Sequence, residues 1–201
     1  GIDMAIHRYE RHNNKKSRNY WTQDEFNKFL DTVNDRLDLR LAFVVSYWTG
    51  IRIGELLALT YQDINLEDKT ISVNKSYQRL NGKGVLTSPK TSNSVRMITM
   101  PDFLVEEFRE YYGQLNETME SKRVFKLEKS DLEHYMAYGI EKSGVNRISI
   151  YELRHSHKNM LVSIGADPQE IARHLGYSSP IPFVITESKL AGLLDKKHGE
   201  A

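Results

Sequence analysis

The segment from residue 37 to residue 47 is apolar on nearly every side after Arg40, and this constrains the fold most strongly. It is rich in Leu, Ala, Phe and Val, and a helix without a polar face has to be surrounded by the rest of its domain. The chain has 201 residues, enough for one well-buried core and a short appended arm. We therefore expect a single domain built around this helix.

Capping residues and a helical period predict further helices around the central one. Thr22 and Glu25 form the capping-box pattern at a helix start. Asp167 followed by Pro168 has the pattern of an N-cap and a first helical residue. Other helices are predicted near Arg52, after residue 101, over residues 130–142, after residue 150 and over residues 187–194.

Between residues 70 and 98 the hydrophobic period changes to two. Ile71 and Val73 alternate with polar residues, residues 81–82 (Asn-Gly) give a turn signal, and short apolar pieces follow. The sequence therefore predicts an α+β fold, mostly helical, with a small antiparallel sheet. Residues 87–94 lie between the last two predicted strands, so we expect Lys90 at a hairpin tip, where a lysine is usually just solvated.

The overall charge does not argue for a nucleic-acid partner, since 28 Lys and Arg stand against 27 Asp and Glu. Residues 1–19 are basic and have no regular period, which predicts either a solvated tail or a strap along a polyanion. Lys15, Lys16 and Arg18 are its candidate DNA-binding residues. The absence of cysteine excludes disulfides and thiolate metal sites, and no apolar run is long enough to span a membrane. We expect a cytoplasmic protein.

Arg52, Lys90 and Arg154 are the candidates for chemistry. Arg52 lies between two predicted buried helices and can pair with Glu55, and Arg154 opens an apolar helix where a charge needs a partner. Taken alone, Arg52 and Arg154 are explained more readily by structural pairing than by a bound anion. Together, two guanidinium groups can hold one phosphate and stabilise its transition state, while an ammonium protonates a leaving oxygen. No cluster with metal-ligand spacing and no glycine-rich phosphate loop occurs, so we expect neither metal nor cofactor.

Four segments, in this order, resemble the motifs of the tyrosine recombinases, in particular the integrases of phages and conjugative elements. They are residues 49–59 with Arg52, 88–101 with Lys90, 151–157 with Arg154, and 173–179 with Tyr177. The resemblance covers about residues 20–179. It implies a tyrosine-recombinase catalytic domain over residues 20–201, ending in a helix and tail over 187–201. Residues 1–19 would then be the linker from a missing N-terminal core-binding domain.

The resemblance also implies a role for each motif residue. Arg52 and Arg154 would clamp the scissile phosphate, Lys90 would be the general acid for the 5′ oxygen, and Glu55 would hold Arg52 in place. Two catalytic positions depart from the family pattern.

Tyr151 stands where the family usually has His, and Tyr177 where it has His or Trp. A tyrosine can hydrogen-bond a phosphate, but with a pKa of about 10 it is a poorer proton shuttle near neutral pH. The nucleophile is unknown, because the family spacing leads to Thr186 and no tyrosine follows Tyr177. Either the chain is a catalytically inactive relative, or a tyrosine-bearing segment is missing between Ser179 and Glu187. We favour the second, since residues 187–194 resemble the terminal helix that follows the nucleophile helix in the family.

The function implied by the resemblance is site-specific recombination of DNA. An integrase of this family cuts and rejoins DNA through a 3′-phosphotyrosyl intermediate, to integrate or excise a mobile element. The partners implied are double-stranded DNA at attachment sites, further copies in a synaptic homotetramer, and a directionality factor. The alternative is a catalytically inactive DNA-binding relative that acts as a regulator. A type IB topoisomerase-like enzyme shares the chemistry but lacks support from the integrase-like Arg154 segment.

The C-terminal helix has two alternative packing partners. It resembles the segment that family members dock on a neighbouring protomer, with Leu190, Leu193 and Leu194 as its apolar contacts. Packing of the same leucines on their own domain is an equal alternative.

Overall fold

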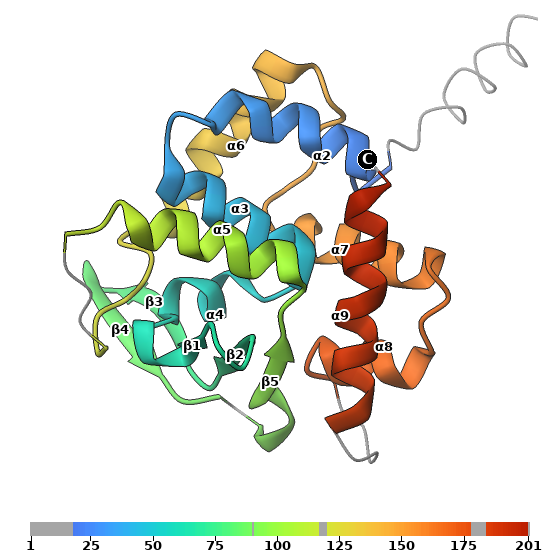
Figure 1. The fold of residues 1–201 in the computed structure, drawn as a ribbon. Helices are drawn as coiled ribbons and strands as arrows, with labels where there is room; N and C mark the ends of the chain where they lie inside the picture. The colour runs from blue at the N-terminus through green and yellow to red at the C-terminus, as the bar shows by residue number, and fades with distance from the viewer. Residues whose placement is uncertain (1–17, 90, 117–119, 178–183, 201) are drawn as a thin grey trace, which may run out of the picture.

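A computed structural model describes residues 18–89, 91–116, 120–177 and 184–200, and its helices surround α3 (Leu37–Thr49) (Figure 1). Every residue of α3 from Leu41 onward is buried. The helices α2 (Gln23–Leu30), α5 (Asp102–Gly113) and α7 (Glu152–Ser163) contact it. The prediction of a central buried helix is confirmed. Gly50 ends α3 with φ of 65°, a left-handed conformation that glycine adopts without a steric penalty.

The predicted helix starts are confirmed at both capping motifs. Thr22 accepts a hydrogen bond from the backbone N–H of Glu25, and Asp167 accepts one from that of Gln169. The remaining α-helices of the described residues are α4 (Ile53–Ala58), α6 (Lys129–Ser143), α8 (Pro168–His174) and α9 (Val184–Gly199). Short 3-10 helices span Asp31–Val33, Tyr61–Asp63 and Ser92–Ser94.

The strands form two separate antiparallel sheets in the described part of the chain. β1 (Ile64–Asn65), β2 (Thr70–Val73) and β5 (Arg96–Thr99) form one, in the order β1-β2-β5. β3 (Ser76–Leu80) and β4 (Lys83–Thr87) form a hairpin of their own. The Asn81-Gly82 turn joins them, with φ of 50° and 77°, as the turn signal predicted.

The prediction that the two strands on either side of Lys90 form a hairpin was wrong. β4 pairs with β3 and β5 pairs with β2, so the segment between β4 and β5 crosses from one sheet to the other. The pairing of β5 with β2 places Ile98 opposite Ile71, and both side chains are buried. This burial favours the crossover over a second hairpin. Lys90 itself lies outside the described residues.

The C-terminal helix α9 packs on its own domain, against α5, α8 and β5 (Figure 1). Leu190 and Leu194 are each 1% exposed, while Leu193 is half-buried. The carboxylate of Asp195 accepts hydrogen bonds from the backbone N–H groups of Asp102 at 2.8 Å and Phe103 at 3.2 Å, and so caps α5. Of the two alternatives for this helix, the described structure shows packing on its own domain.

Buried polar groups join α7, α8 and α9. The Nε2 atoms of His157 and His174 lie 2.9 Å apart, and Nδ1 of His174 lies 2.8 Å from a carboxylate oxygen of Glu187. Burial, and next the neighbouring His174, lower the pKa of His157 well below its ordinary value, so this imidazole is neutral at physiological pH. These bonds fix the end of α8, three residues before Tyr177.

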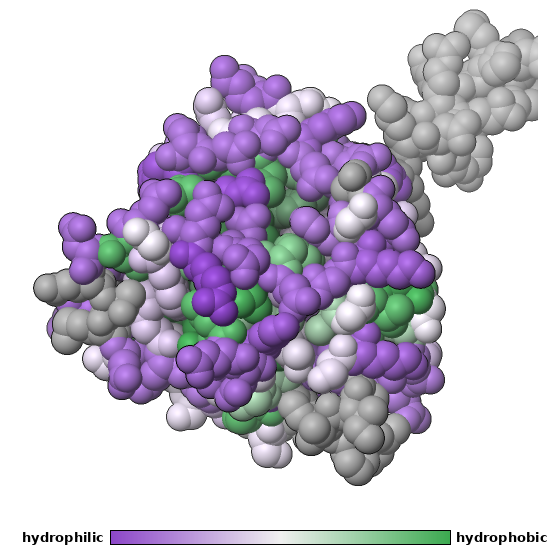
Figure 2. All heavy atoms as spheres, viewed as in Figure 1, coloured by the Kyte–Doolittle hydropathy of each residue, from purple (hydrophilic) through white to green (hydrophobic). Residues whose placement is uncertain are grey.

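The face of the molecule that carries α5 and α9 is mostly hydrophilic (Figure 2). Hydrophobic side chains are visible on it in smaller, separate patches. Within the described ranges, no helix combines the length and apolar character needed to cross a membrane.

Candidate phosphate-binding site

Arg52 occupies the N-cap position of α4, just after the Gly50 turn. Its backbone N–H donates to a carboxylate oxygen of Glu55 at 3.0 Å, and its Nη1 donates to the other at 3.3 Å. The predicted pairing of these two residues is thus present. The Arg52 side chain nevertheless remains 40% exposed, so its guanidinium group can meet a ligand while Glu55 holds it.

Arg154 lies in the first turn of α7 and is bonded to backbone, not to a carboxylate. Its Nη1 donates to the carbonyl oxygen of Gly50 at 2.7 Å, and its Nη2 donates to that of Leu175 at 2.5 Å. Burial, and next the nearby charge of Arg52, lower the pKa of Arg154. A guanidinium group stays protonated at physiological pH, so this positive charge is retained, and no carboxylate of the described residues bonds to it.

Tyr177 completes the group. It follows Gly176, whose φ is 83°, and its ring centroid lies 5.1 Å from Cζ of Arg154 and 5.8 Å from Cζ of Arg52. A hydrogen bond with Arg154 lowers the pKa of Tyr177 and outweighs the opposing effect of burial. The fold therefore brings together Arg52, Arg154 and Tyr177, which are far apart in the sequence, and leaves the Tyr177 side chain on the surface.

A cleft of about 370 Å³ lies beside Arg52. Its lining includes Arg52, Glu55, Lys75, Ser88, Pro89 and Thr91. The residues on both sides of Lys90 therefore border the cleft, although Lys90 itself is outside the described residues. Lys75 is paired with Asp63, so its charge is already balanced.

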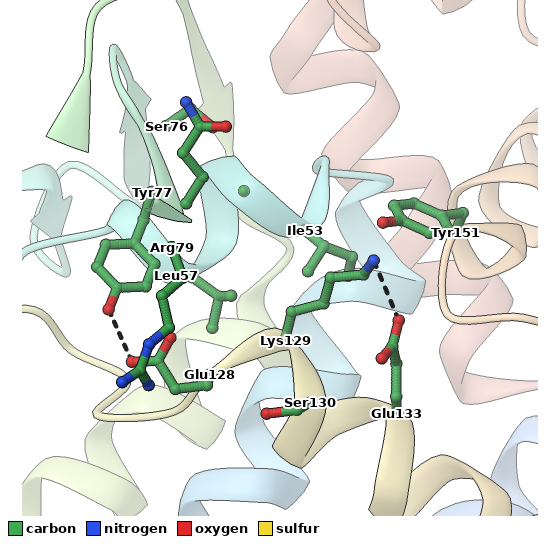
Figure 3. Close-up of a pocket in the computed structure, with 12 residues that line it drawn as sticks. Ile53, Leu57, Ser76, Tyr77, Arg79, Glu128, Lys129, Ser130, Glu133 and Tyr151 are labelled. Atoms are coloured by element: carbon green, nitrogen blue, oxygen red, sulfur yellow. Dashed lines mark hydrogen bonds and ion pairs between the residues drawn. The ribbon is translucent and has the colours of Figure 1, made fainter. Parts of the chain in front are cut away.

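Tyr151 lies at a neighbouring cleft of about 560 Å³ (Figure 3). It is 56% exposed, and Nζ of Lys129 lies 4.8 Å from its ring centroid. Lys129 also pairs with Glu133 at 3.2 Å. The two clefts share Ser76 and Gln78 in their linings. No described contact joins Tyr151 to Arg52 or Tyr177, so the structure does not bring it into their group.

Of the remaining residues named from the sequence, the structure describes only some. Lys15 and Lys16 fall outside it. Arg18 is described, and its Nη2 pairs with Glu25 at 2.6 Å at the start of α2. The side chain of Thr186 also lies outside what the structure describes. In the described ranges, no group of three or more His, Asp or Glu residues is arranged to hold a metal ion.

Sequence reasoning missed Arg96, which is bonded to both carboxylate oxygens of Glu55. A signal for it was present in the strand pattern. Arg96 and Ile98 are two residues apart in β5 and both are buried, while Met97 between them is exposed. An arginine at a core-facing strand position requires a partner, and the sequence does not say which.

Known proteins resemble this chain over most of its length. A family model described as the phage integrase family matches residues 19–181. The ICEBs1 integrase of Bacillus subtilis (strain 168) is 30% identical over 186 residues, which cover 82% of this chain and 49% of that protein. The integrase of Mycobacterium phage L5 is 26% identical over 151 residues, 70% of this chain and 41% of that one. The chain thus spans about half the length of these relatives or less.

Solved structures share the fold. The Tn1549 transposon integrase in complex with transposon right end DNA aligns with a TM-score of 0.68 at 19% identity, over 88% of this chain and 65% of that one. A lambda integrase dimer bound to a core site aligns with a TM-score of 0.56 at 20% identity, over 83% and 60%. The predicted mostly helical α+β fold of a tyrosine-recombinase catalytic domain is confirmed. With a family match over most of its length, this chain belongs to the phage integrase family of tyrosine recombinases.

Proposed function

We propose that this chain is the catalytic domain of a site-specific DNA recombinase, an integrase that serves the integration and excision of a mobile element. The observation that carries the proposal is the convergence of Arg52, Arg154 and Tyr177 on one surface, beside a cleft bordered by the neighbours of Lys90. Membership of the phage integrase family identifies the anion that such a group would bind as a DNA phosphate.

Each residue would act on that phosphate through ordinary chemistry. Arg52 and Arg154 would donate to its nonbridging oxygens and stabilise the charge of the transition state. Tyr177 would donate a hydrogen bond to the same phosphate. Lys90 would protonate the 5′ oxygen as that oxygen leaves. Glu55 would keep Arg52 in place.

Bond making needs a tyrosine that this sequence does not supply after Tyr177. In the family reaction the tyrosine oxygen attacks phosphorus, forms a 3′-phosphotyrosyl bond and releases a 5′ hydroxyl. We propose that a tyrosine-bearing segment belongs between Ser179 and Glu187. Tyr151, exposed beside Lys129, would meet the DNA next to the scissile phosphate.

Double-stranded DNA at attachment sites is the proposed substrate, and the cytoplasm is the proposed compartment. Residues 1–19 would link residues 20–201 to an upstream core-binding domain, with Lys15, Lys16 and Arg18 contacting the DNA backbone. Recombination would take place in a homotetrameric synaptic complex, with a directionality factor selecting excision. The Tn1549 and lambda integrase structures, both with bound DNA, support the choice of substrate.

Intact mass and a covalent-adduct assay on the same protein sample test the proposal. The sample is incubated with nicked duplexes spanning the ends of the element that encodes it, then run on a denaturing gel. A mass above 23.3 kDa, a tyrosine peptide between Ser179 and Glu187, and a DNA adduct that disappears in Arg154→Gln are expected. DNA binding with the mass of 23.3 kDa and no adduct would instead identify an inactive DNA-binding regulator. Absence of DNA binding would refute both functions.

A further inference from the structure

The side chain of Arg96 reaches three separate segments of the chain. Its Nη1 and Nη2 donate to the two carboxylate oxygens of Glu55, each at 3.0 Å. Its Nε donates to the carbonyl oxygen of His174 at 2.9 Å, and its Nη1 donates to that of Ser94 at 3.0 Å. The side chain is only 2% exposed. It therefore bonds protein groups throughout and cannot reach a ligand at the surface.

Each of the three segments carries a residue of the proposed site. Glu55 holds Arg52 through two hydrogen bonds. Ser94 closes the crossover that contains Lys90, and His174 ends α8 just before the turn that presents Tyr177. Arg96 thus bonds to the residue that holds Arg52, to the residue that ends α8 before Tyr177, and to the end of the crossover.

The turn before Tyr177 lies directly against these guanidinium groups. A Cβ atom at Gly176 would stand 2.9 Å from Nη1 of Arg96 and 3.3 Å from Nη1 of Arg52. Nη2 of Arg154 donates to the carbonyl oxygen of Leu175, the residue before Gly176, at 2.5 Å. A displacement of the Arg96 guanidinium would therefore be transmitted to the backbone of this turn and, through Glu55, to Arg52.

An arginine is required for this arrangement. Its planar guanidinium group offers five N–H donors in a fixed fork, so it can grip a carboxylate with two of them and still bond two carbonyls. The ammonium group of a lysine is a compact charge, and its three donors cannot reproduce the parallel pair of bonds to Glu55. A lysine at this position would keep the charge and lose the geometry.

We propose that Arg96 is a positioning residue of the recombination site, which holds Arg52, the Ser94 end of the crossover and the turn carrying Tyr177 in their relative places. It acts through Glu55, Ser94 and His174 and does not touch DNA. The inference rests on the proposed function, since positioning matters only if these residues meet a phosphate. Its first test is made without DNA, so that the positioning role of Arg96 and the proposed function can fail separately.

The matched control is Arg40, whose Nε and Nη2 donate to the two carboxylate oxygens of Glu107 at 3.2 Å and 2.7 Å. This pair has the same bidentate chemistry. It lies near the start of α3, whereas the site residues gather beyond its far end at Gly50. Arg40→Lys therefore removes one arginine fork from the molecule without disturbing the site.

The first measurement is the titration of Tyr177, followed by NMR of the protein with ¹³C-labelled tyrosine and assigned by the loss of its signal in Tyr177→Phe. Contact with Arg154 and Arg52 lowers the pKa of Tyr177 in the wild type. In Arg96→Lys we expect this pKa to rise toward the ordinary tyrosine value of about 10, because the turn and the two arginines no longer hold together. Arg40→Lys should leave it unchanged. An unchanged Tyr177 titration in folded Arg96→Lys would refute the positioning role.

The second measurement is the affinity for duplex DNA at constant salt. Arg96→Lys keeps the net charge, so a change in affinity would come from displaced charge-assisted bonds of Arg52 or Arg154 to a phosphate. We expect binding to be about tenfold weaker. If the wild type binds no DNA, the proposed function fails while the Tyr177 titration still decides the role of Arg96.

Loss of folding in Arg96→Lys would call for the double variant Arg96→Met/Glu55→Gln. It removes both buried charges together, which domains often tolerate, and the amide oxygen of the substituted side chain can still accept from Arg52. We expect the raised Tyr177 pKa in this variant too. Unfolding of both variants, or a wild-type Tyr177 titration in the double variant, would assign Arg96 to general stability and overturn the proposal.

Discussion

At the scale of single residues, positive charge exceeds negative charge at the site. Glu55 is bonded to both Arg52 and Arg96, while the bonds described for Arg154 go to backbone carbonyls. Among the described contacts, two guanidinium groups thus share one carboxylate, and the third bonds to no carboxylate. A bound phosphate would restore the balance, which is why these arginines are better explained by a ligand than by structural pairing alone.

Because Arg52 and Arg96 share the carboxylate of Glu55, neutralising this residue should lower the stability of the fold strongly. Glu55→Gln leaves the buried guanidinium group of Arg96 without its anionic partner, and breaking such a buried pair costs roughly 3–5 kcal/mol. We expect a loss of this size in the free energy of unfolding near neutral pH, measured by urea denaturation. Glu133→Gln, in an exposed pair with Lys129, is the control and should change stability by less than about 1 kcal/mol.

Glu55 should also make the stability of the protein depend on pH in the acidic range. Burial raises the pKa of Glu55, but hydrogen bonds and charges from Arg96 and Arg52 outweigh it, and the net pKa is lowered. The stability this group contributes is therefore present above its unfolded pKa of about 4.3 and is lost as pH falls through its lower folded pKa. Glu55→Gln should show a shallower loss of stability over this acidic range than the wild type. Parallel acid curves for the two proteins would contradict the pKa direction.

At the scale of elements, α9 is held by apolar contacts and by polar contacts to α5 and α8. Leu190 and Leu194 are buried against its own domain, Asp195 caps α5, and Glu187 bonds His174 at the end of α8. The helix therefore stabilises the turn that presents Tyr177 as well as the core.

Truncating a leucine of α9 should lower the free energy of unfolding more on the buried face of the helix than on its partly exposed face. Leu190→Ala should lower the free energy of unfolding by about 2–5 kcal/mol, the range for a buried leucine. The half-buried Leu193 is the matched control, because it is the same residue type on the same helix. Leu193→Ala should cost clearly less in the same denaturation experiment. Equal losses would show that α9 does not pack on its own domain in solution.

At the scale of the whole molecule, function depends on where positive charge gathers, since the net charge is only +1. Electrostatic attraction to DNA has to come from a local surface, and the surface with Arg52 and Arg154 is the proposed one. The position of the charges, rather than their sum, then determines how strongly binding responds to salt.

A salt titration of DNA affinity tests this localisation. Arg52→Gln should weaken binding and reduce the slope of log affinity against log salt by about 0.9, the value for a single neutralised phosphate. Arg40→Gln removes the same charge near the start of α3 and should leave the slope unchanged. Equal effects of the two substitutions would mean that affinity follows net charge and not this site.

The sequence by itself determined the local elements and their order. The apolar segment of α3, the capping box at Thr22, the N-cap at Asp167 and the Asn81-Gly82 turn depend on residues within a few positions of each other, so they could be predicted without the fold. The same holds for the family motifs, which are contiguous stretches of residues.

Only the tertiary structure decided which distant residues meet. It placed Arg52, Arg154 and Tyr177 together, left Tyr151 at the neighbouring cleft and put Arg96 between three segments. It also turned the expected Lys90 hairpin into a crossover and packed α9 on its own domain. The physical reason is that strand pairing and the partner of a buried charge are chosen by burial across the whole core, and local periodicity contains no information about that choice.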